Sequence, residues 1–343
     1  MGLIKRGSKL LFIGNPMIDM VAKAFPAGMS PPDSTSRHLP MEEVKVIEEA
    51  LDLQGTLLFR GPAGGAYSAA AAAAVYHSKV TMIGSAGSDE EYFRQGAAMG
   101  KFRFFDPVAS EMELGDQALS AGRFISFTED KTGPFANPSA ALSFRQCHIP
   151  PISKQDIPFF EGFLLSRFPA TFTVASPLCA VDLSAPFIAD RLHDHIDSLE
   201  KNSRLILFGN IEESEHFFDV DFGFGRQPGS ALRKAIDTFC RRGHCYLLKM
   251  GAQGAWMFQW EGEKLEERYI PPLSVKGIHP VNTGDAFAGA FLGSIAAEHS
   301  LPEALKAAAY AGAAVASVIG NIAGGRSDQT DKASYSEGET TTV

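Results

Sequence analysis

The sequence has 343 residues, enough for one large α/β domain with an accessory piece or for two domains. Apolar residues make up 45% of it, as in globular proteins with a sizeable core, and its net charge is −9 without a basic patch, which argues against nucleic acid as the partner. No apolar run reaches the roughly 20 residues that cross a membrane, and no signal-peptide pattern is visible. The four cysteines show no zinc spacing. These features predict a cytoplasmic protein without a membrane segment.

The first half of the chain repeats a pattern of apolar strand, turn and helix. We expect strands over residues 9–13, 56–61 and 79–83, and helices over residues 41–51, 66–76 and 90–100. The first strand ends at Gly14-Asn15-Pro16, shortly before Asp19. The segment that follows, 102–135, is rich in strand-forming residues and predicts a small exposed sheet.

The second half continues the pattern. Three segments each give an apolar run followed by a turn: TFTVASPLCAVDLSAPFIADRL, RLILFGNIEESEHFF and CYLLKMGAQGAWMF. The last two helices begin near Asp285 and Pro302. Repeated units of this kind favour an α/β fold with a central, mostly parallel sheet and helices on both faces. Ligands of such sheets bind beyond the carboxyl ends of the strands. The polar tail, 326–343, is expected to be disordered.

The segment HPVNTGDAFAGAFLG, residues 279–293, places a carboxylate at the start of an apolar helix. Capping alone would explain Asp285, because acidic residues suit a helix N-terminus. Alternatively, the N–H groups of Asn282, Thr283 and Gly284 could hold a phosphoryl group while Asp285 takes a proton from an attacking hydroxyl. From this segment alone, capping is the simpler interpretation.

Two further turns carry candidate ligands. Asn210 and Glu213 follow a buried strand in FGNIEES, where they could hold hydrated Mg²⁺ on a nucleotide or simply cap the next helix. Gly64 and Gly65 in GPAGGAY allow a small ligand to approach the backbone closely, although a plain tight turn would need them equally.

Six motifs then occur in the order found in one known family. They are GNPMIDMVA, PAGGAYSAA, GSAGSD, DLSAPFI, FGNIEE and NTGDAFAGAFLG. Together they resemble the ribokinase-like (PfkB) carbohydrate kinases, and within that family the chain is most similar to adenosine kinases. The resemblance covers about residues 8–325, which we interpret as one kinase domain whose lid comes from segments at about 20–60 and 101–147.

The resemblance implies a role for each motif. Asp285 would be the general base, with Gly284, Thr283 and Asn282 forming the anion hole. Asp19 would bind sugar hydroxyls, supported by Asn15 and by Gly64 and Gly65. Asn210 and Glu213 would position Mg²⁺ through water, and Gly251 and Gly254 would contact ATP.

The chain departs from the family pattern at several positions. The Asp-Thr pair that opens the anion-hole motif is His279-Pro280 here, which puts activation by monovalent cations in doubt. An Asn that helps to grip the ribose in adenosine kinases is Ala69, and the last Gly of the GxxGxDxxG turn is Tyr92. The loss at Ala69 weakens the case for adenosine itself more than the case for a kinase.

The function predicted from these motifs is an ATP- and Mg²⁺-dependent kinase acting on a primary hydroxyl of an adenosine-like nucleoside or a sugar. One alternative is a sugar kinase for a ribose- or fructose-like substrate, and another is a degenerate kinase that binds nucleosides without turnover. The expected partners are small molecules, with no nucleic acid and no membrane. The chain would be a monomer or a homodimer formed through the lid.

Overall fold

The structure is a computed structural model that describes residues 7–32, 38–108, 119–129, 132–222, 227–275 and 279–319. The strands are β1 (Leu10–Ile13), β2 (Met17–Ala22), β3 (Leu57–Ala63), β4 (Val80–Ile83), β5 (Arg103–Phe105), β6 (Gly122–Phe127), β7 (Phe135–Asn137), β8 (Ile157–Glu161), β9 (Leu178–Asp182), β10 (Arg204–Asn210), β11 (Cys245–Lys249), β12 (Ala255–Glu261) and β13 (Lys264–Ile270). The α-helices are α1 (Met41–Gln54), α2 (Gly65–Ala74), α3 (Glu90–Met99), α5 (Gly162–Leu165), α6 (Pro186–Ala189), α7 (His193–Glu200), α8 (Ile211–Phe218), α9 (Ser230–Arg241), α10 (Thr283–Ala296) and α11 (Leu301–Ala316).

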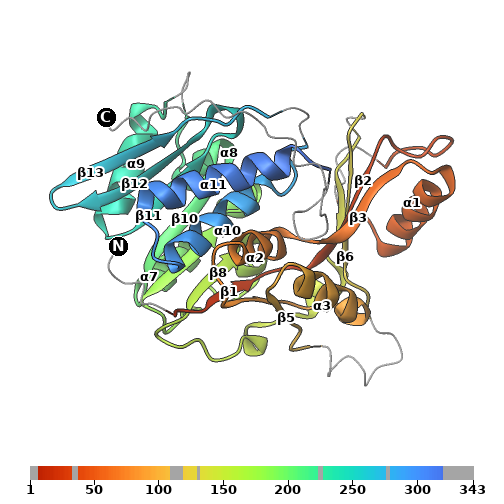
Figure 1. Cartoon of the computed structure of the whole chain (residues 1–343), viewed down its shortest axis with the longest axis horizontal. Helices are drawn as coiled ribbons and strands as arrows, with labels where there is room; N and C mark the ends of the chain where they lie inside the picture. Colours follow the sequence, from red (N-terminus) through yellow and green to blue (C-terminus); the bar gives the residue numbers. More distant parts are fainter. Residues whose placement is uncertain are drawn as a thin grey trace.

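Nine strands form one large sheet in the order β13-β12-β11-β10-β9-β8-β1-β4-β5 (Figure 1). Neighbouring strands from β5 to β11 run parallel, and β12 and β13 add an antiparallel edge. Neighbouring residues of one strand enter opposite cores, as Phe159 and Phe160 of β8 do. Helices α2, α10 and α11 cover one face, and α7, α8 and α9 cover the other. The predicted α/β fold with two covered sheet faces is therefore confirmed.

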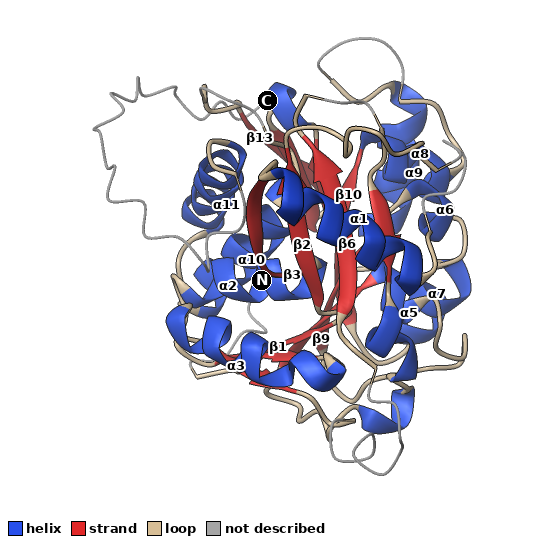
Figure 2. Ribbon diagram, turned by 90° about the vertical axis from the view of Figure 1, so that its right-hand side faces the viewer, coloured by secondary structure: helices blue, strands red, loops and turns tan. Residues whose placement is uncertain are grey.

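A second sheet of four strands, in the order β3-β2-β6-β7, stands apart from the large one. Helix α1 packs on one face of this small sheet (Figure 2), where Val44, Ile47 and Leu51 meet apolar residues such as Met20 and Ile125. The predicted lid has this β-rich character. Its strands β2 and β3 pair antiparallel, and β2 pairs parallel with β6.

The ends of the second predicted lid segment, about 101–147, lie outside the small sheet. Strand β5 pairs with β4 and extends the large sheet instead. The carboxylate of Asp106 holds the chain there, because it accepts from the N–H groups of Ala86 (2.7 Å) and Val108 (2.9 Å). Phe144 packs into the core of the large sheet. The predicted tail, 326–343, and the last residues of the proposed kinase domain lie outside the described residues.

Candidate active site

Four neighbouring strands of the large sheet end in a polar residue at the same edge. Strands β8, β9, β10 and β11 end at Glu161, Asp182, Asn210 and Lys249. The registers pair Glu161 with Asp182, and Asn210 with Lys249. Phe208, two residues before Asn210, pairs with Asp182. Because side chains alternate along a strand, all four belong to the face that α2 and α10 cover.

Helix α10 begins at this edge with an open first turn. Asn282, just before the helix, has a left-handed backbone (φ 63°, ψ 3°), and its side chain makes no capping bond. The first helical hydrogen bond runs from the N–H of Ala286 to the Asn282 carbonyl, 3.0 Å away. Among the predicted anion-hole residues, Thr283 already donates its N–H to the Pro280 carbonyl (3.4 Å), and the carboxylate of Asp285 accepts from its own N–H. The N–H of Gly284 precedes the first helical bond, so the turn offers this donor to an anion.

Asp285 lies in this first turn, beside the start of α2. A Cβ placed on Gly65 would be 3.0 Å from Oδ1 of Asp285 and 3.3 Å from Oε1 of Glu161. Two carboxylates therefore flank one glycine, and a side chain there would press on both. The predicted neighbours Gly65 and Asp285 are brought together, and Glu161 joins them without having been predicted.

Close packing of α2 against α10 holds these two residues near each other. A Cβ on Gly289 would collide with the backbone of Ala69, and a Cβ on Gly293 would lie 2.5 Å from the carbonyl oxygen of Ala73. The Ala-rich α2 and the small residues of α10 thus let the two helix axes approach closely. Ala69 is fully buried in this contact.

The predicted acceptor residues gather on one side of Asp285. Asp19, on β2, is buried and accepts a 2.7 Å hydrogen bond from the side-chain amide of Asn282. The N–H of Asn15 donates to Glu161 over 2.6 Å. Gly64 has a positive φ of 94°, and a Cβ there would strike the Asn15 carbonyl. Within the described residues, the buried Oδ1 of Asn15 has no hydrogen-bond partner.

The carboxyl groups of this region share an excess of negative charge. Burial, opposed by the Asn282 hydrogen bond and assisted by Asp285, raises the pKa of Asp19 to about 7. Burial also raises the pKa of Glu161 to about 8. The pKa of Asp285 rises to about 6, chiefly through burial and Asp182, while Lys249 lowers it. A pKa near the working pH suits a group that takes up a proton during a reaction.

A cavity of about 520 Å³ opens at the start of α10, where Thr283 and Gly284, the two residues before Asp285, line it. Lys249, Gly251, Gly254, Thr283 and Gly284 all line it. The walls continue through residues 271–275 and into α10 and α11, where Phe287 and the small residues Ala309, Gly312, Ala313 and Ala316 face the space. The volume is in the range of small-molecule sites, which are mostly apolar with a few polar groups.

Glycine is required at the turn between β11 and β12. Gly251 and Gly254 have positive φ angles of 54° and 88°. A Cβ on Gly254 would collide with the carbonyl oxygen of Ile270. These two predicted nucleotide-binding residues therefore lie in the same cavity as the start of α10.

Asn210 and Glu213 cap helix α8. The Asn210 side chain accepts from the Glu213 N–H (2.9 Å), and Glu213 accepts from the backbone N–H (2.8 Å) and the side-chain amide (2.7 Å) of Asn210. Burial raises the pKa of Glu213 to about 7, against the opposing charge of Lys249. In the described part of the chain, no three acidic, His or Cys side chains form a metal-binding group.

Asp182 and Lys249, like Glu161, are additional polar residues of this edge. The Lys249 ammonium donates to Oδ2 of Asp182 over 2.6 Å. All three residues end an apolar run: IPFFE, LCAVD and CYLLK. A polar residue at the carboxyl end of a buried strand is the signal that could have found them.

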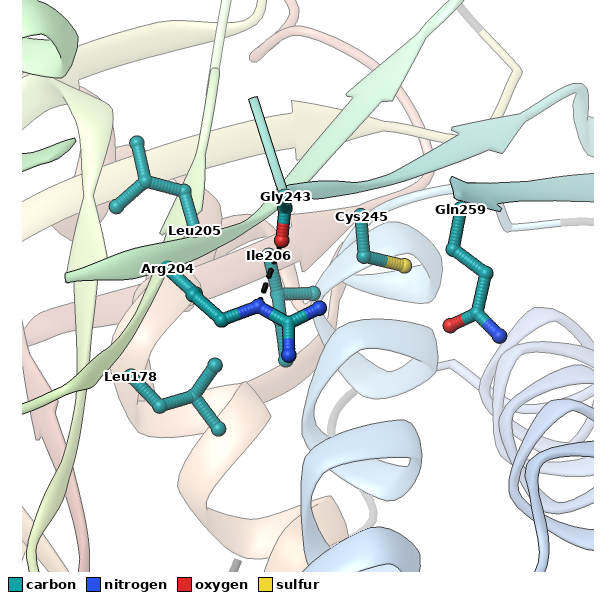
Figure 3. Close-up of a pocket in the computed structure, with 7 residues that line it drawn as sticks. All are labelled: Leu178, Arg204, Leu205, Ile206, Gly243, Cys245 and Gln259. Atoms are coloured by element: carbon teal, nitrogen blue, oxygen red, sulfur yellow. Dashed lines mark hydrogen bonds between the residues drawn. The ribbon is translucent and has the colours of Figure 1, made fainter. Parts of the chain in front are cut away.

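A second, much smaller cavity lies at the opposite end of the strands (Figure 3). Its lining includes Leu178, Arg204 and Cys245, the first residues of β9, β10 and β11. Its volume of about 10 Å³ has room for about one water molecule. The Arg204 guanidinium there donates to the Gly243 carbonyl over 2.7 Å. This cavity is a packing feature remote from the candidate site.

Comparisons with known proteins agree with this arrangement. The family model described as pfkB family carbohydrate kinase matches residues 154–327, just over half of the chain. The chain is 24% identical to adenosine kinase 2 of Arabidopsis thaliana over 341 residues, which covers 88% of this chain and 92% of that protein.

Solved structures show the same fold. A probable sugar kinase from Rhizobium etli superposes with a TM-score of 0.70 at 16% identity and covers 92% of this chain and 94% of its own. Adenosine kinase from Schistosoma mansoni, in complex with 2-fluoroadenosine, has a TM-score of 0.70 at 16% identity and covers 92% and 97%.

None of the helices in the described part of the chain is both long and apolar enough to traverse a lipid bilayer. The large sheet, the small sheet beside it and the open helix end at Asp285 accompany a family match over the C-terminal half. The chain belongs to the pfkB family of carbohydrate kinases.

Proposed function

We propose that the protein transfers the terminal phosphoryl group of ATP to a primary hydroxyl of a nucleoside, with adenosine-like nucleosides as the leading substrates. One observation carries this proposal: Asp285 adjoins two different groups of residues. The first is the buried polar group of Asp19, Asn15 and Gly65, and the second lines the cavity at Gly251, Gly254 and Gly284, the residue just before Asp285. An acceptor and a phosphate donor could thus meet at one carboxylate.

Each of these two groups of residues has the chemistry that its ligand needs. Asp19 and Glu161 provide acceptors for the hydroxyl groups of a sugar, and the unpaired Oδ1 of Asn15 adds another. In the cavity, the apolar wall at Phe287 and Ala313 suits a base, and the first turn of α10 suits phosphate.

In this proposal Asp285 accepts the proton of the attacking hydroxyl, and the N–H groups at the start of α10 stabilise the transferring group. General-base catalysis contributes about 10²–10⁴-fold to such reactions. Asn210 and Glu213 would hold the hydrated Mg²⁺ of the nucleotide, whose charge neutralises the phosphates. Asp182 lies near both Glu213 and Asp285, and a cation there would offset the mutual repulsion of these acids.

A sugar kinase is the second candidate, and Glu161 favours it. This carboxylate lies beside Gly65, where it adds a hydroxyl-binding group to Asp19. Ala69, by contrast, removes a group that adenosine kinases use on the ribose. A small polyol would use the additional acceptor and would not need the missing amide.

An acceptor panel tests the proposal. ADP release would be measured with Mg²⁺ and ATP in the presence of adenosine, other nucleosides, ribose and fructose. Turnover with nucleosides supports the first candidate, and turnover with sugars alone selects the second. Thermal stabilisation by nucleosides without ADP release would instead indicate a catalytically inactive binding protein.

A further inference from the structure

Lys249 occupies an unusual place for a lysine. It is the last residue of β11, its side chain is only 13% exposed, and its ammonium is fixed on Asp182. The same ammonium would be 3.2 Å from a Cβ placed on Gly284. It therefore lies directly beneath the open first turn of α10.

The surroundings of Lys249 keep it charged. Burial by itself would lower the pKa of this lysine, but the carboxylates of Asp182, Glu213 and Asp285 together raise it above its ordinary value. Lys249 also lines the cavity, beside Gly251, Gly254 and Thr283. A permanent positive charge is thus presented where the proposed function places the phosphates.

Resting on that proposed function, we propose that Lys249 is a catalytic residue whose ammonium contacts the phosphoryl group while it moves from ATP to the acceptor. In this step the bond between the terminal phosphorus and the bridging oxygen of ADP breaks, and ADP keeps the electron pair. A bond forms from the acceptor oxygen to phosphorus, and Asp285 takes the acceptor proton. Lys249 remains protonated throughout and offsets the charge that develops on the phosphoryl oxygens.

Lys249 also acts on the base. The charged groups that face Asp285 are Asp182 from β9, Glu161 from β8, Asp19 from β2, Glu213 from α8 and Lys249 from β11. Four of these are acids that favour the protonated form of Asp285, and Lys249 opposes them. Its removal would therefore raise the pH at which Asp285 becomes an active base.

The test compares Lys249→Met, Lys249→Arg and the control Lys264→Met. Lys264 is an exposed lysine of β13, with 78% of its side chain exposed, paired to Glu266. We expect Lys249→Met to lower kcat by about 10²–10³, as loss of one preorganised donor does, with a smaller change in KM for ATP. The acid limb of its pH–rate profile should move to higher pH. Lys249→Arg should recover part of kcat, and Lys264→Met should match the wild type.

A purely structural lysine would give a different pattern. To separate misfolding from lost catalysis, the double variant Asp182→Asn/Lys249→Met removes both partners of the ion pair, so that neither partner is left as an unpaired buried charge. A double variant with wild-type thermal stability and low kcat supports the proposal. Wild-type kcat and an unshifted acid limb in Lys249→Met would overturn it and leave the proposed kinase function standing.

A separate measurement tests Lys249 if the proposed kinase function itself is wrong. If the wild-type protein phosphorylates no acceptor, binding of Mg²⁺ with a non-hydrolysable ATP analogue is measured for the wild type and Lys249→Met. Weaker binding to the variant, by about tenfold, supports a phosphate contact at Lys249. Equal binding overturns it.

Discussion

Helices α8 and α10 start at the same edge of the large sheet, but their N-termini are capped differently. At α8, Asn210 and Glu213 satisfy each other's backbone N–H groups in a reciprocal capping box. At α10, Asn282 turns its amide toward Asp19 on the small sheet and leaves the first turn uncapped. An uncapped turn facing a cavity is a site for an anion, whereas a capped turn is a stable helix end.

Lys249 lies near both carboxyl groups, but their other neighbours differ. Glu213 receives two hydrogen bonds from Asn210. Asp285 has Glu161 across Gly65 and Asp19 beyond Asn282, both of them acids. The difference teaches that identical residue types, a carboxylate in a first helical turn, take different roles according to whether the turn is closed. Four changes would break or sharpen this comparison.

The largest effect should come from Asp285→Asn. This change keeps the shape of the side chain but removes the proton acceptor, so we expect kcat to fall about 10³-fold. The unfolding midpoint should fall little or rise, because a buried carboxyl group is replaced by a neutral amide. Steady-state ADP release and thermal melting check both. Turnover near that of the wild type would show that Asp285 is only a helix-start residue.

A smaller effect is expected for Asn282→Gly. Glycine accepts the left-handed backbone at this position but cannot bond Asp19. Loss of a hydrogen bond to a charged group typically costs about 1.5–3 kcal/mol, so KM for the acceptor should rise about tenfold or more. Acceptor titrations at saturating ATP measure this. A change confined to KM for ATP would show that Asn282 supports ATP binding and not acceptor binding.

The buried carboxyl group of Glu161, near the start of α10, should also make the stability of the protein depend on pH. A carboxyl group whose pKa is raised by folding stabilises the protein below its unfolded pKa, and that contribution is lost as pH rises through the folded pKa. Glu161, shifted from 4.5 to about 8, should therefore make the free energy of unfolding fall between pH 5 and 8. The slope from one such group is at most about 1.4 kcal/mol per pH unit.

Urea denaturation of the ligand-free protein at several pH values tests this, with Glu161→Gln as the variant. We expect a shallower decline in the variant. Glu266, paired with the exposed Lys264, provides the control Glu266→Gln. Equal slopes in the wild type and Glu161→Gln would mean that Glu161 is ionised in the folded protein at neutral pH.

The smallest effect separates a cap from a ligand. Asn210→Ala removes the first residue of the capping box at α8, and Ser300→Ala does the same at α11. Only the other end of α11 lines the cavity. Both should lose about 0.5–2 kcal/mol of stability. Only Asn210→Ala should raise KM for ATP, by a few fold. Identical kinetics in the two variants would reduce Asn210 and Glu213 to a structural cap.

Much of the fold followed from sequence patterns because each buried parallel strand is an apolar run ended by a turn. Strand β8 was not predicted, although IPFFE has the same form, and its terminal Glu161 was missed with it. The antiparallel pair β12 and β13 was also not predicted as a hairpin. β13 is only partly buried along its length, so its residues show no clean alternation.

The sequence predicted those site residues that belong to a recognisable motif. It did not predict the residues that join the site only through tertiary contacts. Gly65, Asp285 and Gly254 lie in recognisable turns, and the structure places them around one region. Lys249 and Asp182 belong to different strands and meet only through the sheet order. Pairing of that kind depends on which strands become neighbours, which a single sequence does not state.

The close contact between Gly289 and Ala69 packs α2 against α10. Gly65 and Asp285 stand at the same end of this helix pair, so the packing of the two helices sets the spacing between them. Asp19 belongs to β2 of the small sheet and meets the start of α10 through its hydrogen bond with Asn282. An engineer who wishes to change the acceptor should therefore work on β2, which leaves the helix pair intact. A methyl group added at Gly289 would push α10 away from α2 and so move the proposed base, Asp285, although Gly289 itself contacts neither Asp285 nor the acceptor site.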